Sequence, residues 1–159
     1  MIGTGRLDLV PLRPEHAAEM AEVLADPALH TFTGGEPCSA DALRARYERL
    51  AAGSPDPAQR WLNWVIRLRD EDRLTGTVQA TITGDTAEIA WVVGTPWQRR
   101  GIASEAARGL VGWLATQSVR TVVAHVHPEH HASAAVAASA GLTATGELHD
   151  GEVRWRREL

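Results

Sequence analysis

The feature that most constrains the fold is a change of hydrophobic period between Ala87 and Leu114. Apolar residues alternate along the chain from Ala87 to Val93, which is typical of a strand with one buried face. From Ile102 to Leu114 they recur every three or four positions, which is typical of a helix that buries one face. The turn residues 94–96 (Gly-Thr-Pro) separate the two segments. The pattern therefore predicts a strand, a tight loop and an amphipathic helix, in that order.

The loop that leads into this helix predicts an anion site. Its small residues let backbone N–H groups come close to a bound anion. These groups open a helix, so they have no partner within it and lie at its positive end. We expect them to hold a pyrophosphate, with Arg99 and Arg100 adding two permanent charges. The loop is not a P-loop, because the chain contains no Lys, and it lacks the three spaced glycines of the dinucleotide fingerprint.

Length and composition exclude several other classes of protein. A chain of 159 residues suits one domain, which we place over residues 1–159. The net charge of −4 provides no basic field for nucleic acid or an anionic membrane. The single cysteine, Cys38, cannot form an internal disulfide and fits a reducing compartment. No stretch has the length and apolarity of a signal peptide or a membrane span, so we expect a cytoplasmic protein.

The remaining patterns predict eleven elements in the order β-α-α-β-β-β-α-β-α-β-β. A strand from Leu7 to about Arg13 precedes a helix that Pro14 opens and a second helix that Ser39 caps, with a loop over 28–38 between the helices. Four strands and two helices follow to Gly141, and the segments on either side of Gly84-Asp85 are expected to form an antiparallel hairpin. The strand at 122–126 is expected to lie parallel to the strand that ends at Val93. Two short strands, about 142–148 and 152–157, close the chain.

This order resembles the GNAT superfamily of N-acyltransferases over nearly the whole chain, and residues 98–103 (Gln-Arg-Arg-Gly-Ile-Ala) resemble its acetyl-CoA-binding motif. The resemblance implies an α/β (α+β) single-domain GNAT fold. Its central sheet would be mixed and mostly antiparallel, with splayed central strands and helices on both faces. The segment from Arg6 to Pro14 and the pair Ala132-Ser133 resemble the ribosomal-protein N-terminal acetyltransferase branch. This chain departs from that branch at His130, where Asn is usual, and at Leu142, where Phe is usual.

The resemblance also implies which residues bind the co-substrate acetyl-CoA. The pantetheine arm would bond to the backbone of the first splayed strand, near its end, and would pass the residue at the usual Asn position. The pyrophosphate would lie on the loop and the first turn of the helix. The cofactor-binding residues expected on this basis are Trp91, Val92, Val93, Gln98, Arg99, Arg100, Gly101, Ile102, Ala103, Ser104 and His130. We expect no metal.

Two residues are candidates for catalysis. Glu88 lies on a strand face that is otherwise apolar, where a carboxylate needs a partner, a water or a role. We interpret it as the base that deprotonates the acceptor, and the alternative is a solvated or ion-paired carboxylate. Ser133 matches the position that protonates or holds the departing thiolate in the similar branch, and the alternative is a serine that caps a helix.

The densest titratable cluster comprises His125, His127, His130 and His131, which leaves two further hypotheses open. His125 or His127 could serve as the base in place of Glu88, or three of the histidines could bind zinc. Trp61 could line an acceptor pocket or be a half-buried surface residue, whereas Trp64 and Trp113 are expected in the core.

These residues together predict an acetyl-CoA-dependent N-acetyltransferase that acts by direct attack within a ternary complex. The acceptor would be a primary amine, and a peptide α-amine, an amino acid and an amine-bearing antibiotic all remain open. The acidic balance favours a cationic acceptor. A non-catalytic acyl-CoA-binding domain on the same fold is the first alternative, and a metal-binding module is the second. The sequence leaves a homodimer open.

Overall fold

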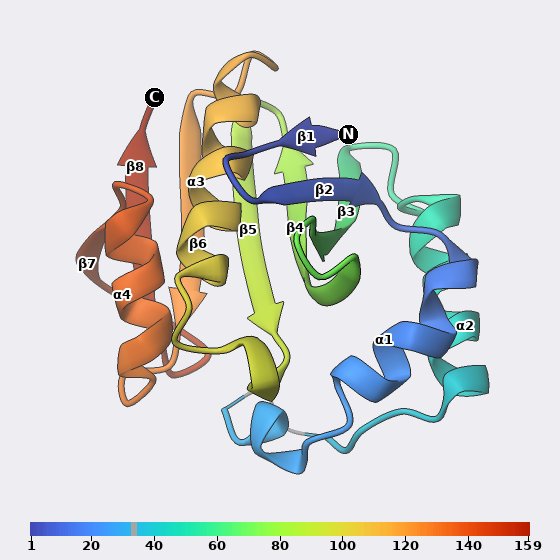
Figure 1. Ribbon diagram of the computed structural model, residues 1–159. Helices are drawn as coiled ribbons and strands as arrows, with labels where there is room; N and C mark the ends of the chain where they lie inside the picture. Colours follow the sequence, from blue (N-terminus) through green and yellow to red (C-terminus); the bar gives the residue numbers. More distant parts are fainter. Residues whose placement is uncertain (33–34) are drawn as a thin grey trace.

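A single eight-stranded sheet organises the molecule, and a computed structural model describes residues 1–32 and 35–159. The strands lie in the order β1-β2-β3-β4-β5-β6-β8-β7 (Figure 1). Of the seven strand pairs in the described residues, β5–β6 is parallel and the other six are antiparallel. The expected mixed, mostly antiparallel sheet of the GNAT fold is therefore confirmed.

The strands are β1 (Ile2–Gly3), β2 (Leu7–Pro11), β3 (Gln59–Leu68), β4 (Arg73–Thr83), β5 (Thr86–Val93), β6 (Thr121–Val126), β7 (Thr143–His149) and β8 (Glu152–Glu158). The α-helices are α1 (Ala17–Val23), α2 (Ala40–Ala52), α3 (Ile102–Ala115) and α4 (His131–Ser139). Three short 3₁₀ helices are η1 (Pro14–His16), η2 (Pro27–His30) and η3 (Thr95–Trp97).

All eleven predicted elements are present, with four differences in detail. The two-residue strand β1 was not predicted, and the first predicted strand ends at Pro11 rather than at Arg13. The helix that Pro14 opens is 3₁₀ for its first turn and α-helical only from Ala17. The predicted loop 28–38 contains the end of η2, and its residues Thr33 and Gly34 lie outside the described residues.

Both faces of the sheet are covered at its centre. Trp64, Val65 and Ile66 are consecutive on β3 and all buried, although their side chains must point alternately to the two faces. The helices α3 and α4 lie over β5, β6 and β8 in Figure 1, whereas α1 and α2 contact β4 and β3. Trp64 is in the core as predicted, and the half-buried Trp113 of α3 packs edge-on against it at 5.3 Å.

The ends of α2 illustrate how local sequence sets an element. Ser39 Oγ accepts a hydrogen bond from the Ala42 N–H at 3.2 Å, as the predicted N-cap should. At the other end the chain turns at Gly53, whose φ of 89° is disfavoured for a residue with a side chain. The helix therefore begins and ends where the sequence places its cap and its glycine.

Candidate active site

The strands β5 and β6 diverge at the centre of the sheet. Their parallel ladder covers three residue pairs, from Thr86–Thr121 to Glu88–Val123. Beyond that point β5 remains paired with β4 as far as Val93, and β6 remains paired with β8 as far as Val126. The two strands separate toward their C-terminal ends in Figure 1. The facing backbone edges of these segments are therefore available to a ligand, as expected for splayed strands.

A side-chain hydrogen bond connects the diverging part of β5 to helix α4. The indole N–H of Trp91 donates to Ser133 Oγ at 3.0 Å. Ser133 belongs to the first turn of α4, the helix that follows β6. A serine hydroxyl has one hydrogen to donate and two lone pairs that accept. Because Trp91 donates to this oxygen, the hydroxyl hydrogen of Ser133 is left to point elsewhere.

His130 is the N-cap of α4, so the alternative interpretation of Ser133 as the cap is wrong. His130 Nδ1 accepts from the Ser133 N–H at 3.3 Å, which is the bond that an Asn side chain makes at this position. The His130 ring stacks on Phe32, with 4.5 Å between ring centroids, and Phe32 also contacts the His127 ring. Burial lowers the pKa of His130, and the neighbouring His127 and His131 lower it further.

The side chain of Glu88 is half exposed and contacts a histidine. Its side chain is 54% exposed, and its Oε1 lies 2.7 Å from Nδ1 of His125, whose own side chain is only 8% exposed. His125 Nε2 in turn accepts from Arg154 Nε at 3.2 Å. The structure thus brings together two of the groups that the sequence proposed as alternative bases.

The loop between β5 and α3 contains two left-handed residues. Arg99 has a φ of 62° and Gly101 a φ of 75°, and Gly101 is the N-cap of α3. Left-handed residues at alternate positions turn successive N–H groups toward one side, as in anion-binding nests. The side chain of Gln98 donates to the Val93 carbonyl oxygen at 3.0 Å, which ties the loop to the end of β5.

Arg100, a predicted cofactor residue, has a partner that the sequence did not reveal. It forms an ion pair with Glu71 at 2.7 Å, and both side chains are half exposed. Glu71 also accepts from the indole of Trp97, and these two hydrogen bonds lower the pKa of Glu71. Arg99 is exposed, as a residue that meets an anion in solvent should be.

Arg6 is a residue of this region that the sequence did not assign. Its guanidinium donates to the Arg100 carbonyl oxygen at 3.0 Å and to Glu105 Oε1 at 2.8 Å. A Cβ placed on Gly101 would lie 3.4 Å from Arg6 Nη2, so this cation stands beside the loop. Arg6 is the first residue of the segment that resembles the N-terminal acetyltransferase branch. That place in the segment was the only indication in the sequence that Arg6 belongs to this region.

The other predicted cofactor residues lie at the end of β5 and in the first turn of α3. Val92 is half-buried on β5, and Ala103 and Ser104 are half-buried on α3. Ile102 and Val93 belong to the buried core, with 1% and 7% of each residue exposed, so we expect a ligand to meet mainly their backbone.

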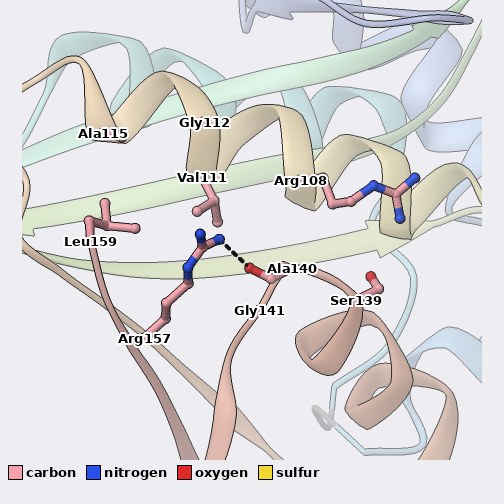
Figure 2. Close-up of a pocket in the computed structure, with 9 residues that line it drawn as sticks. All are labelled: Arg108, Val111, Gly112, Ala115, Ser139, Ala140, Gly141, Arg157 and Leu159. Atoms are coloured by element: carbon pink, nitrogen blue, oxygen red, sulfur yellow. Dashed lines mark hydrogen bonds between the residues drawn. The ribbon is translucent and has the colours of Figure 1, made fainter.

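Two cavities lie away from the diverging strands. The larger, of about 480 Å³, is lined by the C-terminal half of α3, the end of α4 and the end of β8. Figure 2 shows its two arginines pointing in different directions, with Arg157 bonded to the Ala140 carbonyl at 2.9 Å. The smaller, of about 250 Å³, is lined by Trp61 and Asn63 of β3 and by residues of α2. Trp61 is half-buried and donates to Gln59 Oε1 at 3.3 Å.

No group of three His, Cys, Asp or Glu residues stands in a position to hold a metal ion within residues 1–32 and 35–159. The zinc site considered for the histidine cluster is therefore not found there, because His125 contacts Glu88 and Arg154 while His127 and His130 pack on Phe32. In the part of the chain that the structure describes, no helix is both long and apolar enough to span a membrane.

Comparisons with known proteins show the family and the fold of this chain. A family model described as acetyltransferase (GNAT) domain matches residues 6–143. A search of curated proteins finds no match. One solved structure is described as that of a putative ribosomal-protein-serine acetyltransferase from Vibrio cholerae. It has a TM-score of 0.81 to this protein at 17% sequence identity, and the alignment covers 99% of this chain and 97% of that one.

Two further structures have similar folds. RimL, a ribosomal alpha-N-protein acetyltransferase solved with coenzyme A, has a TM-score of 0.81 at 18% identity, covering 98% of this chain and 96% of that one. The aminoglycoside acetyltransferase AAC(6')-Ib, also solved with coenzyme A, has a TM-score of 0.78 at 15% identity, covering 96% and 94% of the two chains. At these sequence identities the structural similarity shows the fold alone.

Proposed function

The chain belongs to the acetyltransferase (GNAT) domain family, and on that premise we propose that it transfers an acetyl group from acetyl-CoA to a primary amine by direct attack within a ternary complex. The main observation that supports the proposal is the divergence of β5 and β6. Glu88 lies where the strands begin to separate, and the loop before α3 follows the end of β5. One end of that region suits an anion, and the other end offers a carboxylate.

The residues present fit coenzyme A. The N–H groups at the start of α3 have no helical partner, and Gly101 has no Cβ to keep a phosphate away from them. Arg99 would add positive charge there, and Arg6 and Arg100 lie beside the loop, paired with Glu105 and Glu71. The open backbone edges of β5 and β6 would take the amide groups of the pantetheine arm. Bound acetyl-CoA would supply the activated acyl group.

Ser133 is the proposed proton donor or hydrogen-bond donor to the departing thiolate. Trp91 occupies one of its lone pairs, so the hydroxyl hydrogen is available at the place where α4 approaches the diverging strands. The His130 cap holds the backbone of the same residue. Two contacts therefore fix the position of one hydroxyl.

Glu88 is the proposed base, acting directly or through a water. Its carboxylate is half exposed, so an acceptor can reach it, and one of its oxygens is held by His125. An α-amine has a pKa of about 7.7–8.0, so a modest base suffices to give the neutral nucleophile. Cys38, the only cysteine of the chain, is exposed before α2, which supports direct attack over a thioester on the enzyme.

The acceptor is proposed to be a cationic primary amine, either a peptide α-amine or an amine-bearing small molecule. The net charge of −4 favours a cation, and both acceptor classes occur among the structures of similar fold.

Replacing Glu88 tests this assignment. Glu88→Gln keeps the shape of the side chain and removes its basicity, so kcat should fall by roughly 10²–10⁴-fold. Affinity for acetyl-CoA should stay the same, and the loss should shrink toward about pH 9, where more of the amine is already neutral. The control is Glu129→Gln, which alters an exposed carboxylate in the turn before α4. Equal kcat values for the two variants would contradict a role for Glu88.

A further inference from the structure

His125 occupies the middle of a chain of side chains that runs across three strands. It contacts Glu88 of β5 at 2.7 Å through Nδ1 and Arg154 of β8 at 3.2 Å through Nε2. Arg154 is directly opposite His125 in the β6–β8 ladder, and it also approaches Glu147 of β7 at 3.4 Å. The ring of His149 stacks on His125 at 4.7 Å. Every charged or titratable group in contact with His125 thus comes from β5, β7 or β8 in the described structure.

Arg154 determines which nitrogen of His125 carries the proton. An arginine Nε–H is always a donor, so the nitrogen that faces it must be an unprotonated acceptor. The proton of the neutral ring then lies on Nδ1, where it is donated to Glu88 Oε1. Of the two neutral tautomers, the contact therefore selects the one that carries its proton on Nδ1.

We propose that Arg154 is a positioning residue that acts through His125 to keep Glu88 ready as a base; this proposal rests on the assignment of Glu88 made above. A neutral ring gives Glu88 one hydrogen bond at Oε1 and leaves the other carboxylate oxygen for the proton of the acceptor. An imidazolium would instead pair with the carboxylate and compete with that proton.

The neighbouring arginine on the same strand face provides a matched control. Arg156 lies two residues from Arg154 on β8, and it is opposite Val123 in the β6–β8 ladder. Its guanidinium bonds to Glu158 and not to a histidine. Removing Arg156 changes the charge of this face to the same extent without altering the contact to His125.

The experiment compares Arg154→Met, Arg154→Lys and Arg156→Met. Nitrogen-15 NMR of the histidine rings reads the tautomer of His125 without any turnover. Arg154→Met should convert the Nδ1–H signature to a mixture of tautomers, whereas Arg156→Met should leave it unchanged. With acetyl-CoA and a primary-amine acceptor, Arg154→Met should lower kcat on the order of tenfold at constant KM for acetyl-CoA. That is less than the roughly 10²–10⁴-fold loss expected when a base itself is removed. Arg154→Lys, which retains a cationic donor, should recover part of the loss.

The double variant Glu88→Gln with Arg154→Met separates this proposal from the assignment of Glu88. If Arg154 acts through Glu88, its removal should have no further effect once Glu88 is Gln. An unchanged His125 tautomer in Arg154→Met, or equal kcat losses in Arg154→Met and Arg156→Met, would overturn the role of Arg154. If Glu88→Gln alone has full activity, the base assignment fails, and the NMR result still decides whether Arg154 sets the tautomer.

Discussion

The hydroxyl of Ser133 is the smallest part of the site on which the proposed chemistry depends. The hydroxyl oxygen accepts from Trp91, and the backbone N–H of Ser133 donates to His130. These two contacts fix the position of the residue and leave the hydroxyl hydrogen free. The proposed role of Ser133 therefore depends on the indole N–H of Trp91, a donor that a purely apolar ring lacks.

Trp91→Phe tests that dependence because it keeps an aromatic ring on β5 and removes the donor. The change should raise the activation free energy by about 0.5–1.5 kcal/mol, the net value of one hydrogen bond. In a Ser133→Ala background the same change should cost nothing further, since the acceptor is gone. Trp113→Phe, which alters a half-buried tryptophan of α3, is the control. Additive losses in kcat for Trp91 and Ser133 would show that the contact has no catalytic role.

Single residues also show where sequence reasoning stopped. Strand alternation placed Glu88 on the face of Ala90 and Val92, whereas Ser133 was expected at the site only from the resemblance to the GNAT branch. The sequence did not reveal that Arg100 pairs with Glu71, and it gave Arg6 no role. Both outcomes depend on ion pairs between segments far apart in the chain, which periodicity does not encode.

At the scale of elements, the loop before α3 depends on a glycine conformation. Gly101→Ala should lower coenzyme A affinity at least tenfold, because a Cβ intrudes on the backbone that would meet the phosphates. The positive φ adds a strain of roughly 1–2 kcal/mol to the folded state. Gly53→Ala is the control for backbone strain away from the loop. Gly53 has a φ of 89° and a ψ of 178°, a conformation that a residue with a Cβ avoids even more strongly than that of Gly101, and nothing lies within 4 Å of its Cβ position. Calorimetry should find a loss of stability in both variants and a loss of affinity in Gly101→Ala alone, and unchanged affinity there would refute the phosphate site.

Helix α4 should lose its cap in acid. Burial lowers the pKa of His130 from its ordinary value of 6.5, helped by His127 and His131, so the unfolded chain takes up a proton before the folded one does. The stability that neutral His130 provides is present above about pH 6.5 and is lost as pH falls through its lowered pKa. Protonation of Nδ1 also removes the acceptor for the Ser133 N–H.

His130→Asn keeps a cap that does not titrate, so the melting temperature of this variant should fall less than that of the unaltered protein between about pH 6.5 and 5. His131→Asn, which alters an exposed residue one position later, should retain most of the original pH dependence. Melting curves across this range that are the same for His130→Asn and the unaltered protein would rule out the mechanism.

The boundaries of the elements could also be predicted from the sequence only in part. Glycine and cap signals predicted both ends of α2, because these act through local backbone geometry. The strand β1 has two residues and no periodic pattern to reveal it, and the 3₁₀ turns at Pro14 and Pro27 differ from an α-helix by only a small change in backbone angle.

For the whole molecule, the order of the elements and the parallel β5–β6 pair could be predicted, since a helical crossover returns a strand parallel to its partner. The divergence of these strands could not be derived from periodicity and was expected only from the resemblance to the GNAT family. The family match over residues 6–143 supports that resemblance. The divergence brings the loop before α3, Ser133 and Glu88 to one region of the sheet.

The diverging strands and the groups around them are proposed to transfer an acetyl group to an amine. The most direct test incubates the purified chain with acetyl-CoA and a panel of short peptides, amino acids and aminoglycosides. Release of free coenzyme A thiol and the mass of the acceptor would be measured together. We predict that at least one cationic primary amine gains one acetyl group for each thiol released, and that Glu88→Gln nearly abolishes both signals. Tight binding of coenzyme A with no acetylated amine across the panel would contradict acetyl transfer by this site and identify the chain as a non-catalytic acyl-CoA-binding domain.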